Sequence, residues 1–394
     1  MTPDANIPVW DDAPWEGFPG LEGEVKADAC VVGLGGSGLA CIGELLAHGC
    51  SVVGIDAGSV AAGAAGRNGG FLLAGISKFH HEVAAQLGRK RATSLHHLTS
   101  REMTRMARQT PDAIRRCGSL RIAADEAELR DCDAQLAAMR ADGLDAEPYS
   151  GPEGEGLLFP GDGVLQPLHR CRTVARGMVW GGARLFENSP AVAIDARGVA
   201  TPGGRVSAPR VLVCVDGRLD QLLPELATRI RTARLQMLAT APEPSVSFPR
   251  PVYFRHGFEY WRQLEDGCIA IGGFRDRAPD EEWTHSSEPT VRVQGMIEEF
   301  LRGQLGVRAA VTHRWAASVG YTADGLPFAG PVREGVWAAG GYNGTGNVVG
   351  SICGRGIAQL AVDGRGVATP RGRVNAPCVL VCVDGRLDRL LPEL

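Results

Sequence analysis

No apolar run in this 394-residue sequence is long enough to span a lipid bilayer. The N-terminal residues, MTPDANIPVWDDAPW, carry acids and prolines where a secretory signal has a basic region and then an apolar one. A net charge of −4 gives no reason to expect nucleic acid or an anionic membrane surface as a partner. These absences indicate a cytoplasmic globular protein, and a chain of this length is enough for two domains.

The residue spacing of a metal site is also missing. The eleven cysteines include no C-x-x-C pair, which disfavours zinc and thioredoxin-type chemistry. His80–His81 and His96–His97 are adjacent pairs, so the two members of each point to different faces of a helix, and no carboxylate lies at ligand spacing. We expect no metal site and interpret these histidines as parts of surface helices.

A strand, glycine turn, helix and strand follow one another from Asp28 to Asp56. Gly33, Gly35 and Gly38 form G-x-G-x-x-G, in which the glycines permit a tight turn, a close backbone approach and tight packing of helix on strand. The N-terminus of the helix offers N–H groups to a phosphate. The carboxylate of Asp56 can accept hydrogen bonds from ribose hydroxyls. The pattern predicts a dinucleotide site, whereas an ordinary glycine-rich turn without a ligand is the simpler alternative.

Beyond this stretch, the hydrophobic pattern predicts helices over roughly Glu82–Ala107 and Glu126–Ala141. Residues 228–315 contain short strand patterns, which favour an antiparallel sheet, and one helix around Val291–Gln304. Near residue 340 a strand, a Gly/Asn turn and a helix predict a second anion site.

A 32-residue segment, 195–226, recurs as 363–394 with five differences. Solenoid repeats are tandem and need at least three units, so two distant copies do not indicate a solenoid. A doubly wound sheet has one place for this strand. We therefore expect the first copy to be structural and the second to be peripheral.

The sequence resembles the family of FAD-dependent amine and D-amino-acid oxidases, most closely gamma-glutamylputrescine oxidase-like proteins. The resemblance runs from about Trp10 to Val362, and VVGLGGSG, GAAGRNGG (63–70), SPAVAI (189–194) and GGYNGTG (340–346) carry it. It implies an α/β fold of the glutathione-reductase-2 type, with a Rossmann-like FAD-binding domain and a mainly antiparallel substrate domain. The expected FAD-binding domain is 27–75, 160–226 and 316–362, and the substrate domain is 76–159 and 227–315. Residues 1–26 form a lead-in, with Trp10 and Trp15 as anchors.

The resemblance also implies site residues. FAD would contact Gly33, Gly35, Gly36, Ser37, Gly38, Asp56, Ala57, Gly66, Arg67, Asn68, Gly69, Gly70, Val192, Gly217, Gly341, Asn343, Gly344, Thr345 and Gly346. Arg67 to Gly70 would lie along the isoalloxazine, and the helix after Gly346 would stabilise the reduced ring. The catalytic candidates are Tyr260, Tyr321 and Arg67. The substrate candidates are Tyr260, Trp261, Arg262 and Tyr321, with sheet packing or a surface ion pair as the alternative role.

Several positions depart from the family pattern. Thr345 stands where many members have a histidine, and the segment around Val319 has no cysteine, so FAD is expected to be non-covalent. Gly320 and Tyr321 replace an arginine that grips a substrate carboxylate, which favours an amine without an α-carboxylate. Asp216 stands where the family has a small or neutral residue, and an acid there would disfavour a nearby pyrophosphate.

The predicted function is oxidation of a C–N bond in a small amine. Hydride transfer to flavin N5 gives an imine, which water hydrolyses to an aldehyde or ketone. Oxygen or another acceptor would reoxidise the flavin. The alternatives are a catalytically impaired flavin- or nucleotide-binding paralogue and a D-amino-acid or glycine oxidase. An NAD enzyme fits the first motif alone and leaves GAAGRNGG unexplained.

Overall fold

The computed structural model describes residues 4–195, 197–363, 367–369 and 372–374. The chain divides into two compact units. We call residues 14–66, 168–232 and 319 onward the parallel-sheet unit, and residues 1–13, 67–167 and 233–318 the antiparallel-sheet unit. Both combine sheets with helices, which confirms the predicted α/β fold. None of the helices in the described ranges is long and apolar enough to cross a membrane.

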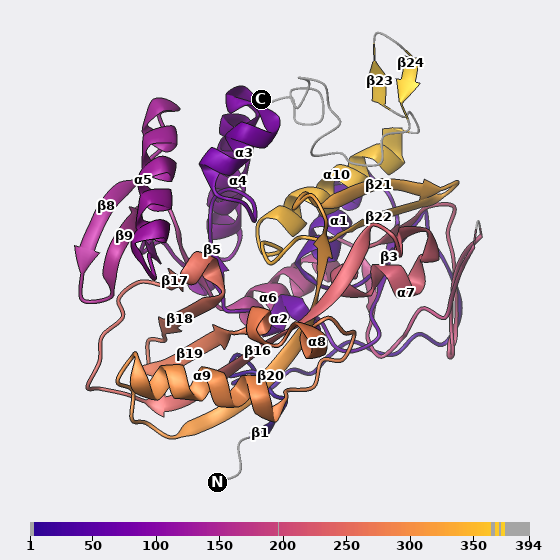
Figure 1. The fold of residues 1–394 in the computed structure, drawn as a ribbon. Helices are drawn as coiled ribbons and strands as arrows, with labels where there is room; N and C mark the ends of the chain where they lie inside the picture. Colours follow the sequence, from indigo (N-terminus) through magenta and orange to yellow (C-terminus); the bar gives the residue numbers. More distant parts are fainter. Residues whose placement is uncertain (1–3, 196, 364–366, 370–371, 375–394) are drawn as a thin grey trace. The chain divides into compact units, whose positions relative to one another are not determined.

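A six-stranded sheet organises the parallel-sheet unit. From edge to edge its strands are β11 (Arg184–Phe186), β4 (Val52–Ile55), β3 (Ala29–Val32), β15 (Val211–Val213), β22 (Val336–Gly340) and β21 (Phe328–Arg333). All residues of β3 and β4 are buried, as expected of apolar strands covered on both faces. The helices are α1 (Gly36–Ala47), α2 (Ala64–Arg67), α6 (Pro167–Trp180), α7 (Leu219–Leu222) and α10 (Val349–Asp363), and α1 and α10 lie side by side (Figure 1).

The first copy of the duplicated segment packs in the core of this unit. It supplies β13 (Gly198–Thr201) and β14 (Gly204–Ser207), which lie between β12 (Ala193–Asp195) and β2 (Gly23–Lys26) in a four-stranded sheet. Val199, Val206 and Val213 are fully buried and belong to one hydrophobic cluster with residues of β3 and β4. The copied residues thus connect both sheets of the unit.

Only part of the second copy is described. β23 (Val367–Thr369) and β24 (Gly372–Val374) pair with each other in a two-stranded sheet. The register of Val367 opposite Val374 repeats that of Val199 opposite Val206. The expectation that the whole second copy is peripheral concerns residues that lie largely outside the described part of the chain.

The antiparallel-sheet unit is built on a nine-stranded sheet. Its strands in order are β1 (Asp4–Ala5), β20 (Val311–Thr322), β16 (Ile230–Pro242), β19 (Cys268–Gly273), β18 (Glu259–Gln263), β17 (Val252–Phe254), β7 (Ser119–Ile122), β9 (Gly154–Phe159) and β8 (Glu147–Gly151). A three-stranded sheet contains β5 (Phe71–Leu72), β10 (Gly163–Leu165) and β6 (Ile114–Arg115). The helices are α3 (His80–Leu87), α4 (Arg89–Gln109), α5 (Glu126–Ala141), α8 (Pro279–Glu282) and α9 (Val291–Gly303).

Two features differ from the sequence-based expectations. The single helix expected over Glu82–Ala107 is two helices, α3 and α4, because Gly88 between them has a φ of +88° and ends the first one. Residues 67–75, 160–167 and 316–318, expected in the domain with the dinucleotide motif, pack in the antiparallel-sheet unit, and residues 227–232, expected in the substrate domain, pack in the parallel-sheet unit.

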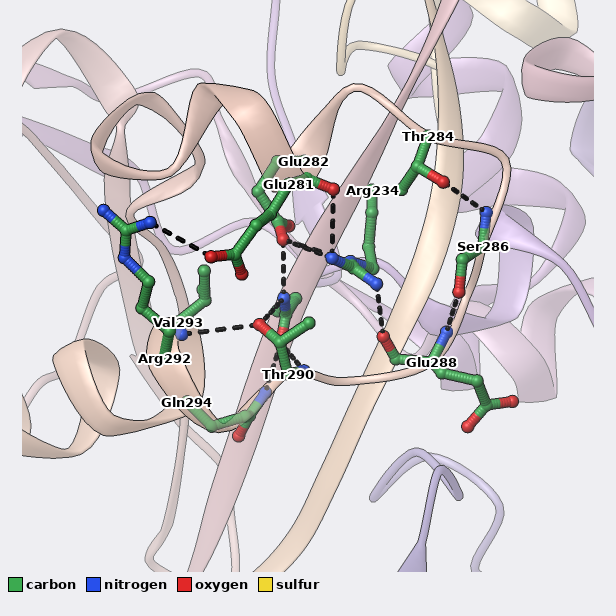
Figure 2. Close-up of polar contacts among 11 residues, drawn as sticks. Arg234, Glu281, Glu282, Thr284, Ser286, Glu288, Thr290, Arg292, Val293 and Gln294 are labelled. Atoms are coloured by element: carbon green, nitrogen blue, oxygen red, sulfur yellow. Dashed lines mark hydrogen bonds and ion pairs between the residues drawn. The ribbon is translucent and has the colours of Figure 1, made fainter.

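A buried ion pair connects α8 and the loop before α9 to β16 (Figure 2). Arg234 Nη2 lies 2.7 Å from Glu282 Oε1, and the two side chains are 7% and 2% exposed. The same guanidinium donates to the carbonyl oxygens of Glu281 and Glu288. Gln236 donates to Glu282 and to Thr290, whose hydroxyl caps α9. One cation therefore holds both ends of the loop between α8 and α9.

We expect Arg234→Met to lower the free energy of unfolding by about 3–5 kcal/mol, because it leaves the Glu282 carboxylate buried without its cation. Arg292 is the matched control, since it pairs with Glu281 at 3.0 Å but is 55% exposed. Arg292→Met should cost less than about 1 kcal/mol. Chemical denaturation of the three proteins measures both changes, and equal losses in the two variants would contradict this account.

Candidate functional site

The glycine turn after β3 has backbone contacts that no side chain can accommodate. Gly33 has a φ of +102°, and a Cβ atom on it would lie 2.5 Å from the carbonyl oxygen of Cys214. A Cβ on Gly38 would lie 1.8 Å from the carbonyl oxygen of Gly33. The helix that follows, α1, has no side-chain cap and no acid in its first turn. Its positive end therefore suits an anionic ligand such as a pyrophosphate.

Asp56 lies beside this turn, at the end of β4. Its carboxylate accepts hydrogen bonds from the backbone N–H groups of Leu34, at 2.7 Å, and Gly58, at 2.9 Å. Burial raises the pKa of Asp56 to about 6, and the two backbone hydrogen bonds oppose that rise. The predicted acid thus connects the strand end to the glycine turn, at the place where the fingerprint needs it.

A second glycine-rich loop leads into α10 in the same unit. Gly341 and Gly344 have φ values of +68° and +87°, and Asn343 has +54°. The Asn343 side chain accepts from the backbone N–H of Thr322 and donates to the carbonyl oxygen of Gly341. The hydroxyl of Thr345, which replaces the expected histidine, donates to the carbonyl oxygen of Tyr342 at 2.8 Å. These side chains stabilise the loop itself.

α10 meets the start of α1 directly. A Cβ on Gly354 would lie 2.0 Å from the carbonyl oxygen of Ser37. The loop before α10 also contacts Tyr321, because a Cβ on Gly344 would lie 3.7 Å from the Tyr321 hydroxyl. The remaining predicted cofactor residues of this unit are Gly35, Gly36, Ala57, Gly66, Val192, Gly217 and Gly346.

Asp216 connects the end of β15 to these loops. It adopts a φ of +44°, and its carboxylate accepts from the backbone N–H groups of Gly320, Gly341 and Tyr342 at 3.1, 2.9 and 3.2 Å. Burial raises its pKa to about 6 against the opposing effect of these bonds. The acid that we expected to oppose a pyrophosphate therefore accepts three backbone N–H groups. The sequence contained no signal for this contact.

Arg67, Asn68, Gly69 and Gly70 lie in the antiparallel-sheet unit. The indole of Trp315 donates to the carbonyl oxygen of Arg67 at 2.7 Å, and that of Trp10 donates to the carbonyl oxygen of Asn68 at 2.8 Å. The Arg67 guanidinium donates to the side chain of Asn6 and the carbonyl oxygen of Ala316. Trp10 is 2% exposed, so it anchors the lead-in as expected.

Tyr260 packs directly on this segment. A Cβ on Gly69 would lie 3.3 Å from the Tyr260 ring. Tyr253 is its cross-strand partner on β17, and Phe71 contacts both, with ring centroids 5.0 Å from Tyr253 and 5.9 Å from Tyr260. Tyr253 and Phe71 were not among the residues predicted from the sequence. The alternation of the two neighbouring strand patterns was the available signal for Tyr253.

Trp261 and Arg262 have other contacts than the substrate contact that we expected. Trp261 points to the opposite face of β18, where it is 2% exposed and packs with Phe254 and Phe300 in the hydrophobic core under α9. Arg262 is 8% exposed and donates to the carbonyl oxygens of Gly70 and Leu165, both at 2.8 Å. Trp261 is therefore a core residue, and Arg262 supports the backbone where we expected a substrate contact.

The adjacent histidines contact carboxylates separately. His80 Nε2 lies 2.7 Å from Asp142 Oδ2, and His81 Nε2 lies 2.9 Å from Asp131 Oδ1. No cluster of three or more histidine, cysteine, aspartate or glutamate side chains suited to a metal ion occurs in the described part of the chain.

The chain is similar to proteins of one family. A profile of the DAO family, described as FAD dependent oxidoreductase, matches residues 28–360. A probable oxidoreductase, OrdL, of Rhizobium meliloti is 28% identical over 88% of this chain and 85% of its own length. The gamma-glutamylputrescine oxidoreductase of Escherichia coli is 26% identical over 87% of this chain and 85% of its own.

Solved structures share the fold. The glycine oxidase of Bacillus cereus superposes with a TM-score of 0.69 at 18% identity, over 86% of this chain and 97% of that one. The L-proline dehydrogenase of P. horikoshii superposes with a TM-score of 0.71 at 19% identity, over 87% and 95%.

The raised pKa of Asp216 predicts a pH effect on stability. Its pKa is about 6 in the folded chain and 3.8 in an unfolded one, so the folded state binds the proton more tightly. The contribution of Asp216 to the free energy of unfolding therefore falls as pH rises from about 4 to about 6 and is constant above, by about 2–3 kcal/mol in total.

Asp216→Asn should remove this part of the pH dependence. Urea unfolding of both proteins between about pH 4 and about pH 7 measures the difference in stability at each pH. We expect this difference in the free energy of unfolding to shift in favour of the variant as pH rises. A difference that stays constant across the range would contradict it.

Proposed function

The chain belongs to the DAO family of FAD-dependent oxidoreductases, and on that premise we propose that it oxidises a C–N bond of a small amine with non-covalently bound FAD. The observation that carries the choice of an amine is the aromatic surface beside Gly69, formed by Phe71, Tyr253 and Tyr260. Aromatic faces attract the cationic and methylene parts of amines. The relative from E. coli, a gamma-glutamylputrescine oxidoreductase, is named for an amine.

The backbone of the parallel-sheet unit fits FAD. Gly33 and Gly38 form a turn in which any Cβ would clash with backbone, and the uncapped start of α1 follows it. We propose that these residues hold the pyrophosphate, that Asp56 binds the ribose, and that the loop 341–346 with α10 faces the flavin. No cysteine occurs in β20, which contains Val319, and this supports non-covalent binding.

The chemistry that FAD supplies when bound is acceptance of a hydride from the carbon next to the amine nitrogen, which leaves an imine that water hydrolyses to an aldehyde or ketone. The role proposed for Tyr260 and Tyr253 is to orient the amine and to exclude water with their rings. Tyr321, whose hydroxyl lies beside Gly344, is the further substrate candidate. Oxygen or another acceptor takes the electrons.

Two arginines bear on the distinction between an amine and an amino acid. Arg67 donates to Asn6 and Ala316, and Arg262 donates to Gly70 and Leu165, so each binds groups of the chain itself. A site for an α-carboxylate needs a guanidinium presented to the ligand. We therefore place amino acids second to amines without an α-carboxylate.

Anaerobic bleaching of the bound flavin tests the function. Purified holoprotein is mixed with a diamine, an N-methylated amine, glycine and a D-amino acid, and the visible flavin band is followed. We expect an amine without an α-carboxylate to bleach it. Bleaching by amino acids alone would favour an enzyme of the glycine oxidase type, and no bleaching with any compound would favour a binding protein without turnover.

Tyr260→Ala should raise KM for the active amine by about two- to tenfold, since an aromatic contact is worth about 0.5–1.5 kcal/mol. Tyr260→Phe retains the ring and should stay within about threefold of the wild type. Steady-state kinetics measures both. Equal KM values for all three proteins would place the amine elsewhere.

Asp56→Asn should weaken FAD binding by about 10- to 100-fold, because hydrogen bonds to a charged group contribute about 1.5–3 kcal/mol. Asp28 is the matched control, since it lies at the other end of the same motif and accepts from Ser51. Asp28→Asn should bind FAD like the wild type. Fluorescence titration of the apoprotein with FAD measures the affinities, and a loss shared by both variants would contradict a specific role for Asp56.

A further inference from the structure

Side chains from three distant parts of the chain hold the backbone carbonyl groups of the segment 67–70. We infer that Trp10, Trp315 and Arg262, here called the carbonyl bracket, are positioning residues for the flavin-facing backbone, and that the Arg262 charge favours the reduced flavin. This inference rests on the proposed function, in which residues 67–70 lie along the flavin.

The hydrogen bonds of the bracket cover three of the four carbonyl oxygens in the segment. Trp315 binds the oxygen of Arg67, Trp10 binds that of Asn68, and Arg262 binds that of Gly70, at 2.7, 2.8 and 2.8 Å. The Gly70 oxygen also accepts from the backbone N–H of Leu165 at 2.8 Å. A segment held at successive carbonyl groups has little freedom to rotate its peptide planes.

The bracket is itself a packed unit. The rings of Trp10 and Trp315 meet edge to face with centroids 6.5 Å apart, and the Arg262 guanidinium lies 5.1 Å from the centre of the Trp10 ring. Trp315 is fully buried. A Cβ on Gly70 would lie 2.5 Å from Arg262 Nη1, so the close contact requires glycine at that position. Trp10 therefore contacts both of the other members of the bracket.

Arg262 brings a positive charge to this place, and its charged neighbours Arg115 and Glu265, which pair with each other, have opposite effects on it. It forms no ion pair with any carboxylate in the described ranges, and its Nε atom is buried without a hydrogen-bond partner. Burial lowers its pKa to about 10, so it stays protonated at neutral pH. Among the described residues, the hydrogen-bond partners of this buried cation are carbonyl dipoles, and a cation held in this way stabilises negative charge that develops nearby.

The test uses FAD-loaded protein and needs no substrate. The midpoint potential of the bound flavin is measured against reference dyes in the wild type, Arg262→Met and Arg262→Lys. At a fixed dye potential, we expect the ratio of reduced to oxidised flavin to fall roughly tenfold in Arg262→Met, because the buried charge is lost. Arg262→Lys keeps the charge and should stay within about threefold.

The positioning role is tested with indole variants. Trp10→Phe keeps a ring but removes the N–H that binds Asn68, so FAD should dissociate about three- to tenfold faster. Trp15→Phe is the matched control, because the Trp15 indole, also in the lead-in, donates to Glu187 in the parallel-sheet unit. It should leave both the FAD dissociation rate and the potential unchanged.

The outcomes separate this inference from the proposed function. A wild-type chain that binds no FAD would refute the proposed function itself. If a folded Arg262→Met protein has the flavin midpoint potential of the wild type, the proposal that the Arg262 charge favours the reduced flavin is refuted. The positioning role can be tested even if Arg262→Met does not fold. Equal FAD dissociation rates in Trp10→Phe and Trp15→Phe would refute the carbonyl bracket.

Discussion

Direct backbone contact between α1 and its neighbours is the constraint on which the parallel-sheet unit depends. At Gly38 and Gly354 a Cβ would lie within about 2 Å of a backbone carbonyl oxygen, so no other residue fits without moving a main chain. The contact at Gly354 brings α10 against the start of α1, and the contact at Gly38 fixes the first turn of α1 beside the end of β3. The uncapped N–H groups there are consequently held in place before any ligand arrives.

Buried charges in this protein hold loops. Asp216 binds three backbone N–H groups, Arg262 binds two carbonyl oxygens, and Arg234 binds two carbonyl oxygens together with Glu282. Each charged group is desolvated, so its hydrogen bonds to the backbone are strong. Losing them would lower the free energy of unfolding, because the charge would stay buried without partners. In each of these three places, the conformation of the main chain is set by a charged side chain behind it.

The duplicated segment separates local from tertiary effects within one chain. The described hairpin of the second copy repeats the register of the first, Val367 opposite Val374 as Val199 opposite Val206. In the first copy β14 also pairs with β2 and its valines are buried. The same residues therefore specify the same hairpin, while its place in a larger sheet depends on which partner strand is available.

The sequence alone determined the α/β fold, the glycine turn with Asp56, and helices such as Glu126–Ala141, because periodicity and glycine spacing act over short distances. The tertiary structure decided the rest. Tyr260 and Trp261 are neighbours in sequence, but the sheet sends one toward Gly69 and the other into the core. Arg262 binds backbone groups 97 and 192 residues away in the sequence, and Asp216 binds backbone groups 104 to 126 residues away. No local sequence pattern encodes contacts at such separations.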